Sequence, residues 1–191
     1  LSTYDGLPTR EKLRLLTITK NLPEELHAEI ADKKAKETIN VLFDTIKPRM
    51  EFTKIFMALK NAGYRLACAS NAVRSTVETA LDCLELRKYF DVIYSNEDVK
   101  KPKPHFEMYF KIMLDMNSKP NETLILEDSH IGRQAVLDAG CHLLPIIDTF
   151  DVKLEKIEAK LNELNKQIIV RVPWRSNKMN VLIPMAGAGS R

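Results

Sequence analysis

The sequence predicts an α/β fold in which a parallel sheet is flanked by helices and preceded by a helical segment. Short apolar runs alternate with helical patterns between residues 65 and 147, whereas residues 1–48 show helical patterns alone. Two runs end in polar residues, with Ser70 and Asn71 after "RLACA" and Glu127 and Asp128 after "TLIL". Such alternation is typical of a parallel sheet covered on both faces, which binds ligands at the C-terminal ends of its strands.

The N-terminal helices are indicated by capping residues and by apolar spacing. A first helix is expected over residues 9–20 with Thr9 as its cap, and a second from Pro23 to about residue 46. A third helix, which Gly63 ends, has apolar residues at i, i+3, i+4 and i+7. These residues are Phe52, Ile55, Phe56 and Leu59.

The core is expected to contain strands at residues 65–70, 91–95, 123–128 and 142–147. A helix with an apolar stripe follows the first strand, and another with one apolar face follows the second. The stripe consists of Val73, Val77, Leu81 and Leu84, and the face of Phe106, Tyr109, Phe110 and Met113. A helix ended by Gly140 follows the third strand.

The sequence changes in character after residue 148. Apolar residues recur at spacings of three and four between charged residues, which predicts an amphipathic helix packed on the core. They are Leu154, Ile157, Leu161 and Leu164. A linker, "VRVPWRSNK", precedes a new apolar strand and a glycine-rich loop. We therefore divide the chain into a partial helical cap (1–48), a core (49–147), a helix with a linker (148–178) and the start of another domain (179–191).

Composition excludes several classes of protein. The chain is 45% hydrophobic and 29% charged, with a net charge of +3 and interspersed lysine and glutamate, which argues against nucleic acid as a partner. It contains three cysteines and no C-x-x-C pair, which favours a reducing, cytoplasmic location. No apolar stretch has the roughly 18 residues that a membrane span needs. Since the chain begins at Leu1 and stops within a motif, we expect it to be part of a longer protein.

Three polar groups at the expected strand ends can share one chemical task. Glu127 and Asp128 offer oxygen ligands for Mg²⁺, Lys101 in "KPKP" offers a positive charge, and Ser70 offers a hydroxyl. Together these groups can neutralise and bind a phosphoryl group, which is the main requirement of phosphoryl transfer.

Each of these residues also has a simpler interpretation. An acid pair after a strand can cap the next helix, Ser70 and Asn71 can form a turn, and Lys101 can be a solvated surface charge. Their order along the chain and their common position at strand ends favour the joint interpretation as a site.

Three stretches occur in the order "LACASNAVRSTVETAL", "NEDVKKPKPHFEMY" and "LILEDSHIGRQAVLDAG", and the last contains a helix with Gly132, Ala135, Ala139 and Gly140. In this order they resemble the second, third and fourth motifs of the haloacid dehalogenase (HAD) superfamily, in its branch of β-phosphoglucomutases and sugar-phosphate phosphatases with a helical cap. The resemblance covers about residues 1–147. It implies a Rossmann-like core.

The resemblance also implies roles for individual residues. Ser70 would bind phosphate beside Asn71, Lys101 would be the lysine of the third motif, and Glu127 and Asp128 would hold magnesium. The family often has Asp after Lys-Pro-x-Pro, where this chain has His105.

Two arginines are candidates for binding a second anionic group of the substrate. "YDGLPTREKL" is similar to the family's substrate loop, in which an arginine closes over the substrate, so Arg10 is one candidate. Arg74, which follows Ser70 and Asn71, is the other. The alternative for Arg10 is a surface position in the first turn of a helix.

The family's first motif is missing from this sequence. In the family, Asp-x-Asp ends the first strand, and the first Asp is the nucleophile that accepts the phosphoryl group. Asp5 has no apolar strand before it, and Asp44 lies in a helical context. The central strand of the sheet is therefore expected to be absent. The chain alone should be inactive, with an exposed gap in the sheet whose apolar edges favour aggregation.

The tail "NVLIPMAGAGSR" resembles the opening of sugar-phosphate nucleotidyltransferases. By that resemblance Gly187, Gly189, Ser190 and Arg191 would bind a nucleoside triphosphate. The alternative is a C-terminal tail without this role.

We therefore expect part of a Mg²⁺-dependent phosphatase or phosphomutase for a small phosphorylated metabolite, such as a sugar phosphate, fused to a nucleotidyltransferase. A catalytically inactive module that regulates or scaffolds the transferase is the alternative. A third possibility is phosphonate or dehalogenase chemistry on the same fold, and Lys101 with the acid pair favours a phosphate ester over haloacid hydrolysis.

Overall fold

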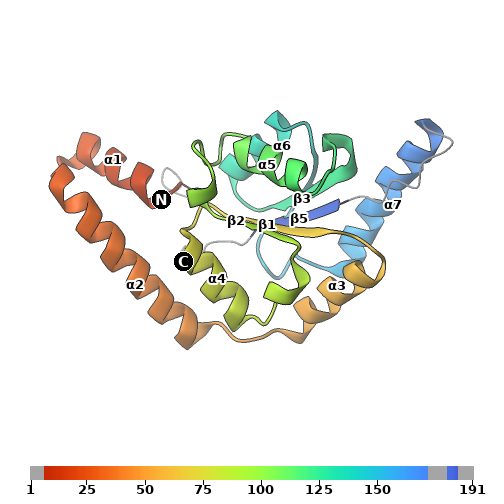
Figure 1. The fold of residues 1–191 in the computed structure, drawn as a ribbon, viewed down its shortest axis with the longest axis horizontal. Coiled ribbons are helices and arrows are strands. Elements are labelled where there is room, and N and C mark those ends of the chain that lie inside the picture. Colours follow the sequence, from red (N-terminus) through yellow and green to blue (C-terminus); the bar gives the residue numbers. More distant parts are fainter. Residues whose placement is uncertain (1–6, 172–179, 185–191) are drawn as a thin grey trace.

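The structure is a computed structural model that describes residues 7–171 and 180–184 (Figure 1). The α-helices are α1 (Thr9–Lys20), α2 (His27–Thr45), α3 (Met50–Asn61), α4 (Arg74–Cys83), α5 (Glu107–Asp115), α6 (His130–Asp138) and α7 (Leu154–Arg171). The strands are β1 (Leu66–Ala69), β2 (Val92–Tyr94), β3 (Thr123–Glu127), β4 (His142–Pro145) and β5 (Asn180–Pro184). Short 3-10 turns are η1 (Glu24–Leu26), η2 (Arg87–Tyr89), η3 (Asn96–Asp98) and η4 (Pro120–Glu122).

The sheet is parallel and five-stranded, in the order β2-β1-β5-β3-β4. The fold class predicted from the alternating pattern is therefore confirmed. Ala69 lies opposite Tyr94 and Pro184, so β1, β2 and β5 end at the same edge of the sheet. Glu127 lies opposite Pro145, which places the ends of β3 and β4 at that edge as well.

The gap predicted in the middle of the sheet is wrong for the described chain. β5 pairs with β1 on one side and with β3 on the other, and the backbone N–H of Val181 donates to the carbonyl of Arg65 at 3.1 Å. The apolar residues of β1 and β3 that a gap would have exposed are therefore buried. The predicted boundary at residue 179 also differs from the structure, because residues 180–184 complete the core sheet.

Helices cover both faces of the sheet, as the sequence predicts (Figure 1). One face packs against α3, α4 and α7 in a cluster that includes Phe56, Leu81, Ile157 and Val181. The other face packs against α5 and α6 in a second cluster. The predicted packing of α7 on the core is confirmed, because Ile157, Leu161 and Leu164 are buried in the first cluster.

The apolar face predicted for α5 is wrong in part. Tyr109 and Met113 are buried, but Phe106 is 38% exposed and Phe110 is 50% exposed. The buried stripe consists instead of Met108, Tyr109, Ile112, Met113 and Met116. These positions recur at i, i+1, i+4, i+5 and i+8, and Phe106 and Phe110 lie on the side of the helix that faces solvent.

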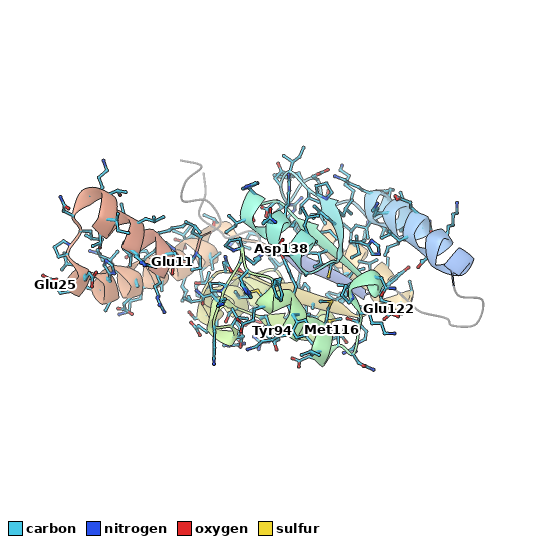
Figure 2. The ribbon with its side chains drawn as sticks, turned by 90° about the horizontal axis from the view of Figure 1, so that it is seen from above. Glu11, Glu25, Tyr94, Met116, Glu122 and Asp138 are labelled. Carbon is cyan, nitrogen blue, oxygen red and sulfur yellow. The ribbon has the colours of Figure 1, made fainter. Side chains whose placement is uncertain are left out.

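The helical segment in front of the core forms a hairpin of α1 and α2 that extends to one side (Figure 1). Glu11 and Glu25 in this hairpin lie well away from Tyr94 and Met116 in the core (Figure 2). The Oγ1 of Thr17 lies 2.8 Å from Nε2 of His27, which ties the two helices together. Pro8, rather than Thr9, takes the N-cap position of α1. No helix among the described residues has both the length and the apolar composition to cross a membrane.

The central position of β5 can be tested at Val181, whose side chain is fully buried. We expect Val181→Ala to lower the free energy of unfolding by about 2 kcal/mol, because it removes buried methyl groups and leaves a cavity. Val41→Ala is a matched control, since Val41 is 51% exposed on α2, and we expect a change within about 0.5 kcal/mol. Urea unfolding measures both, and equal effects would contradict the placement of β5.

Candidate active site at the C-terminal edge of the sheet

Ser70 follows β1 at the edge where the strands end. It is 3% exposed, and its backbone N–H donates to the carbonyl of Tyr94 at 3.0 Å. Its Oγ accepts a hydrogen bond from the backbone N–H of Ala72 at 3.1 Å, which forms a tight turn. A hydroxyl has one proton to donate in addition to its lone pairs, so Ser70 can still donate to an anion at this edge.

Asn71 connects this turn to the loop before α5. Its Nδ2 donates to the carbonyl of Lys103 at 2.9 Å, and the backbone N–H of Lys103 donates to its Oδ1 at 3.1 Å. This reciprocal pair fixes the backbone of Lys103 beside the end of β1.

The structure places Lys103, not Lys101, in the site. The Nζ of Lys103 donates to Oε2 of Glu127 at 3.0 Å and lies 3.4 Å from the carbonyl oxygen of Ala69. The side chain of Lys103 is 7% exposed and that of Glu127 is 1% exposed. Lys101 is exposed instead, so the prediction for Lys101 is corrected. Both lysines in "KPKP" precede a proline, so the local sequence does not distinguish them. The hydrogen bonds between Asn71 and the backbone of Lys103 place the second lysine at the site.

Glu107 closes the loop that carries both lysines. Its carboxylate accepts the backbone N–H of Lys100 at 3.0 Å and that of Lys101 at 2.9 Å. The Nδ1 of His105 accepts the N–H of Glu107, the first residue of α5, at 3.1 Å. The acid that the resemblance leads one to expect at residue 105 is thus supplied in the structure two positions later.

The carboxylate of Glu127 accepts four hydrogen bonds. Oε2 accepts from Nζ of Lys103 and, at 2.9 Å, from the hydroxyl of Tyr109. Oε1 accepts from the backbone N–H of Ser129 at 3.0 Å and from its hydroxyl at 2.8 Å. Burial by itself raises the pKa of Glu127, but the charge of Lys103 and the hydrogen bonds from Ser129 outweigh it and lower the pKa to about 2. Glu127 is therefore a buried anion that is fully paired.

The start of α6 is built around this carboxylate. Ser129 is the N-cap of α6, and its Oγ accepts the backbone N–H of Gly132 at 3.0 Å while it donates to Glu127. A Cβ at position 132 would lie 2.1 Å from Cδ of Glu127, so only glycine leaves room for the carboxylate. The alternative role of the acid pair was to cap the helix that follows it. In the structure Ser129 provides this cap.

Asp128 differs from its neighbour in its electrostatic surroundings. It is half-buried, and burial, together with the charge of Glu127 and a hydrogen bond to that carboxyl group, raises its pKa. The pKa values of the two adjacent acids are therefore shifted in opposite directions, so Glu127 is ionised and Asp128 is the easier of the two to protonate. The repulsion between them is offset by Lys103 on the side of Glu127.

The expected metal site can be tested against these contacts. Within residues 7–171 and 180–184, no group of three or more His, Cys, Asp or Glu side chains lies close enough together to hold a metal ion. The oxygens of Glu127 are taken by Lys103, Tyr109 and Ser129. Asp128 is the more exposed carboxylate of the pair. Because Mg²⁺ is often held by one or two carboxylates with water and phosphate oxygens, the residues fit a magnesium ion bound through Asp128.

The predicted arginines lie outside this cluster. Arg10 is exposed in the first turn of α1, and no contact joins it to the residues at the sheet edge that the structure describes. The guanidinium of Arg74 pairs with Asp98 and, at 3.4 Å, with Glu78, so it is engaged within the core. The predicted role of Arg74 as a substrate ligand is therefore not supported. Gly187, Gly189, Ser190 and Arg191 lie outside the described residues.

Two further residues shape the site and were missed in the sequence. Tyr109 was expected only as part of an apolar face, yet its hydroxyl reaches Glu127. Arg133 holds the ends of β3 and β4 together, because Nη2 donates to the carbonyl of Ile146 at 2.8 Å and Nε donates to that of Glu127 at 3.3 Å. The position of a residue along a helix does not show which groups its side chain contacts, so neither the Tyr109–Glu127 bond nor the bonds of Arg133 could be predicted.

Comparisons with known proteins show the family and the fold. The family model for haloacid dehalogenase-like hydrolases matches residues 1–146. The chain is 36% identical over 128 residues to the pyrophosphatase PpaX of Bacillus cereus (strain B4264), which covers 67% of the chain and 52% of that protein. It is 27% identical over 135 residues to a phosphorylated carbohydrates phosphatase of Thermotoga maritima, covering 71% of the chain and 62% of the relative.

Solved structures show the same fold. A crystal structure of β-phosphoglucomutase from Clostridium difficile superposes with a TM-score of 0.70 at 19% identity, over 88% of this chain and 82% of that one. The chain spans about half the length of several curated relatives that it matches, among them the Bacillus pyrophosphatase. Because the family model covers most of the sequence, the chain belongs to the haloacid dehalogenase-like hydrolases.

Proposed function

We propose that this chain carries the phosphate-binding part of a phosphatase or phosphomutase site for a small phosphorylated metabolite, such as a sugar phosphate. The observation that carries the proposal is the convergence of Ser70, Asn71, Lys103 and the Glu127-Asp128 pair at the C-terminal edge of the sheet. A hydroxyl and an ammonium group on this edge suit the oxygens of a phosphoryl group. The names of the relatives, a pyrophosphatase and a phosphatase of phosphorylated carbohydrates, support the substrate class.

The proposal includes a magnesium ion held by Asp128. When bound, the ion supplies positive charge that neutralises the phosphoryl oxygens. Lys103 supplies a second positive charge, Ser70 a hydrogen bond, and Glu127 holds Lys103 in place rather than serving as a ligand. Arg10, which is exposed in α1, remains a proposed contact for a second charged group of the substrate.

The proposal is tested by titrating the chain with inorganic phosphate in the presence of MgCl₂, followed by calorimetry. We expect saturable binding, and we expect Lys103→Met to weaken it about tenfold or more, because a charge-assisted hydrogen bond is lost. Lys101→Met is the matched control and should change the affinity less than about twofold, as an exposed charge does. Equal losses in the two variants would contradict the assignment of Lys103.

A second variant covers the case in which Lys103→Met fails to fold. Asp128 is half-buried, and Asp128→Asn keeps its volume while it removes the charge that would hold the cation. We expect this variant to bind phosphate with an affinity that no longer depends on Mg²⁺. An unchanged dependence on Mg²⁺ would exclude Asp128 as the metal ligand.

One observation favours the alternative of a non-catalytic module. β5 takes the central position in the sheet, where the resemblance expects the strand with the nucleophilic Asp, and the sequence from residue 180 to 191 contains no acid. We therefore propose that the chain by itself binds phosphate without turning over a phosphate ester. Release of phosphate from p-nitrophenyl phosphate by the purified chain would overturn this. The fusion to a nucleotidyltransferase remains a proposal about residues 185–191, for which binding of a nucleoside triphosphate by the longer reading frame is the test.

A further inference from the structure

Tyr109 contacts both members of the buried ion pair. It lies in α5 with its side chain fully buried, and its hydroxyl donates to Oε2 of Glu127 at 2.9 Å. The Nζ of Lys103 lies 5.7 Å from the centre of its ring, within the range of a cation–π contact. A phenylalanine would fill the same volume, so the hydroxyl is not needed to pack the core.

The hydroxyl of Tyr109 restrains Oε2 of Glu127, and Oε2 in turn holds the ammonium of Lys103. Lys103 has a flexible stem, and its ammonium takes its position from its acceptors. Its acceptor at 3.0 Å is Oε2 of Glu127, and the carbonyl of Ala69 is longer at 3.4 Å. Ser129 donates to the other oxygen, Oε1, whereas Tyr109 and Lys103 both donate to Oε2, so the hydroxyl of Tyr109 restrains the same oxygen that accepts from the ammonium. Without the hydroxyl, the carboxylate can turn about its last side-chain bond and the ammonium can follow it.

We propose that Tyr109 is a positioning residue that holds the ammonium of Lys103 at the phosphate-binding edge through Oε2 of Glu127. This inference rests on the proposed function, because it assigns Tyr109 a role in the same site. Tyr109 itself is fully buried, so its role is to act through Glu127 and Lys103 and not by contact with the substrate.

The test compares Tyr109→Phe with Tyr94→Phe. Tyr94 in β2 also donates its hydroxyl to a carboxylate, Oδ2 of Asp115 at 2.8 Å, but this bond is exposed and lies at the last residue of α5. The substitution Tyr94→Phe keeps the backbone carbonyl that accepts the N–H of Ser70, so it changes only the hydroxyl. Both variants lose one hydroxyl bond to an acid. We expect Tyr109→Phe to weaken the binding of inorganic phosphate with Mg²⁺ about tenfold, and Tyr94→Phe to leave it within about twofold.

A second measurement reads the position of Lys103 directly. Reductive methylation followed by mass spectrometry gives the rate at which each lysine is modified. We expect Lys103 to react faster in Tyr109→Phe than in the unmodified sequence, and at the unchanged rate in Tyr94→Phe. If Tyr109→Phe lowers the melting temperature but changes neither the affinity for phosphate nor the methylation rate of Lys103, the residue is merely structural and the inference fails.

The two proposals fail in different ways. If the unmodified chain does not bind phosphate, the proposed function is wrong whatever the variants show. If it binds phosphate and Tyr109→Phe binds equally well, the proposed function stands and the role of Tyr109 is refuted.

Discussion

Glu127→Gln is expected to lower the free energy of unfolding by about 3–5 kcal/mol. The substitution keeps the volume of the side chain but leaves the ammonium of Lys103, which is 7% exposed, without an anion. A buried charge that loses its partner costs far more than the pair contributes when it is intact. A loss of this size is a large fraction of the 5–15 kcal/mol typical of a folded domain. Urea unfolding monitored by circular dichroism measures it.

The control for this prediction is an exposed pair of the same chemistry. Lys160 and Glu163 in α7 lie 3.0 Å apart, with side chains 27% and 54% exposed. We expect Glu163→Gln to cost less than about 1 kcal/mol. The double variant Lys103→Met with Glu127→Gln should be more stable than Glu127→Gln alone, because it removes the orphaned charge. A double variant no more stable than the single one would show that the loss does not come from the unpaired lysine.

The same carboxylate makes a defined contribution to the dependence of stability on pH. The folded pKa of Glu127 is about 2, below its ordinary value of 4.5, so the unfolded chain takes up the proton first as the pH falls. The stabilisation is present above pH 4.5 and is lost as the pH falls toward 2. The unfolding free energy of Glu127→Gln should therefore fall less steeply in this range than that of the unmodified chain.

Gly132→Ala is expected to destabilise the fold by about 3 kcal/mol, because of overpacking. In the interior of an ordinary helix, the same change stabilises by about 1 kcal/mol, because glycine loses more backbone entropy than alanine. Here the new Cβ would lie 2.1 Å from Cδ and 2.3 Å from Oε2 of Glu127. The carboxylate cannot retreat without breaking its bonds to Lys103, Tyr109 and Ser129. Thermal and urea unfolding show whether the substitution lowers or raises the free energy of unfolding.

Gly140→Ala separates this contact from the general effect of replacing a glycine. Gly140 has a φ of +70°, and a Cβ there would meet its nearest neighbour, Pro120, at 3.8 Å. Its cost should come from the left-handed backbone alone, about 1 kcal/mol. If Gly132→Ala were stabilising, the close approach of α6 to Glu127 would be wrong.

The order of the strands and helices could be predicted from the sequence because each element has its own periodicity. Residues 9–20 were expected as a helix and form α1 with those bounds, and the apolar runs that were expected as strands form β1 to β4. Local periodicity does not, however, specify the orientation of a helix with apolar residues on two sides. This is why Phe106 and Phe110 were expected to be buried and are exposed.

The residues of the site were predicted less completely than the fold. Ser70, Asn71, Glu127 and Asp128 lie where the ends of β1 and β3 place them. Lys101 was predicted and Lys103 takes the place in the structure, because spacing along a loop does not show which side chain turns inward. That choice depends on the amide of Asn71, which lies far from the loop in the sequence and binds the backbone of Lys103.

The position of β5 between β1 and β3 could not be predicted from local sequence patterns. "NVLIP" is apolar enough for any sheet, and its neighbours along the chain suggested a separate unit. Its place between β1 and β3 is determined by long-range backbone pairing, for which the sequence offers no periodic signal.

The central strand is also the last of the five in chain order, and this has a consequence for biosynthesis. Among the described strands, β1 pairs only with β2 and β5, and β3 only with β4 and β5, so before β5 is made we expect β1–β2 and β3–β4 to form two separate ribbons. Each ribbon then presents an apolar edge that a chaperone or another polypeptide can occupy. Translation of a few further residues joins the ribbons, so we expect proteolysis of stalled nascent chains to show protection of the core only after β5 has emerged from the exit tunnel.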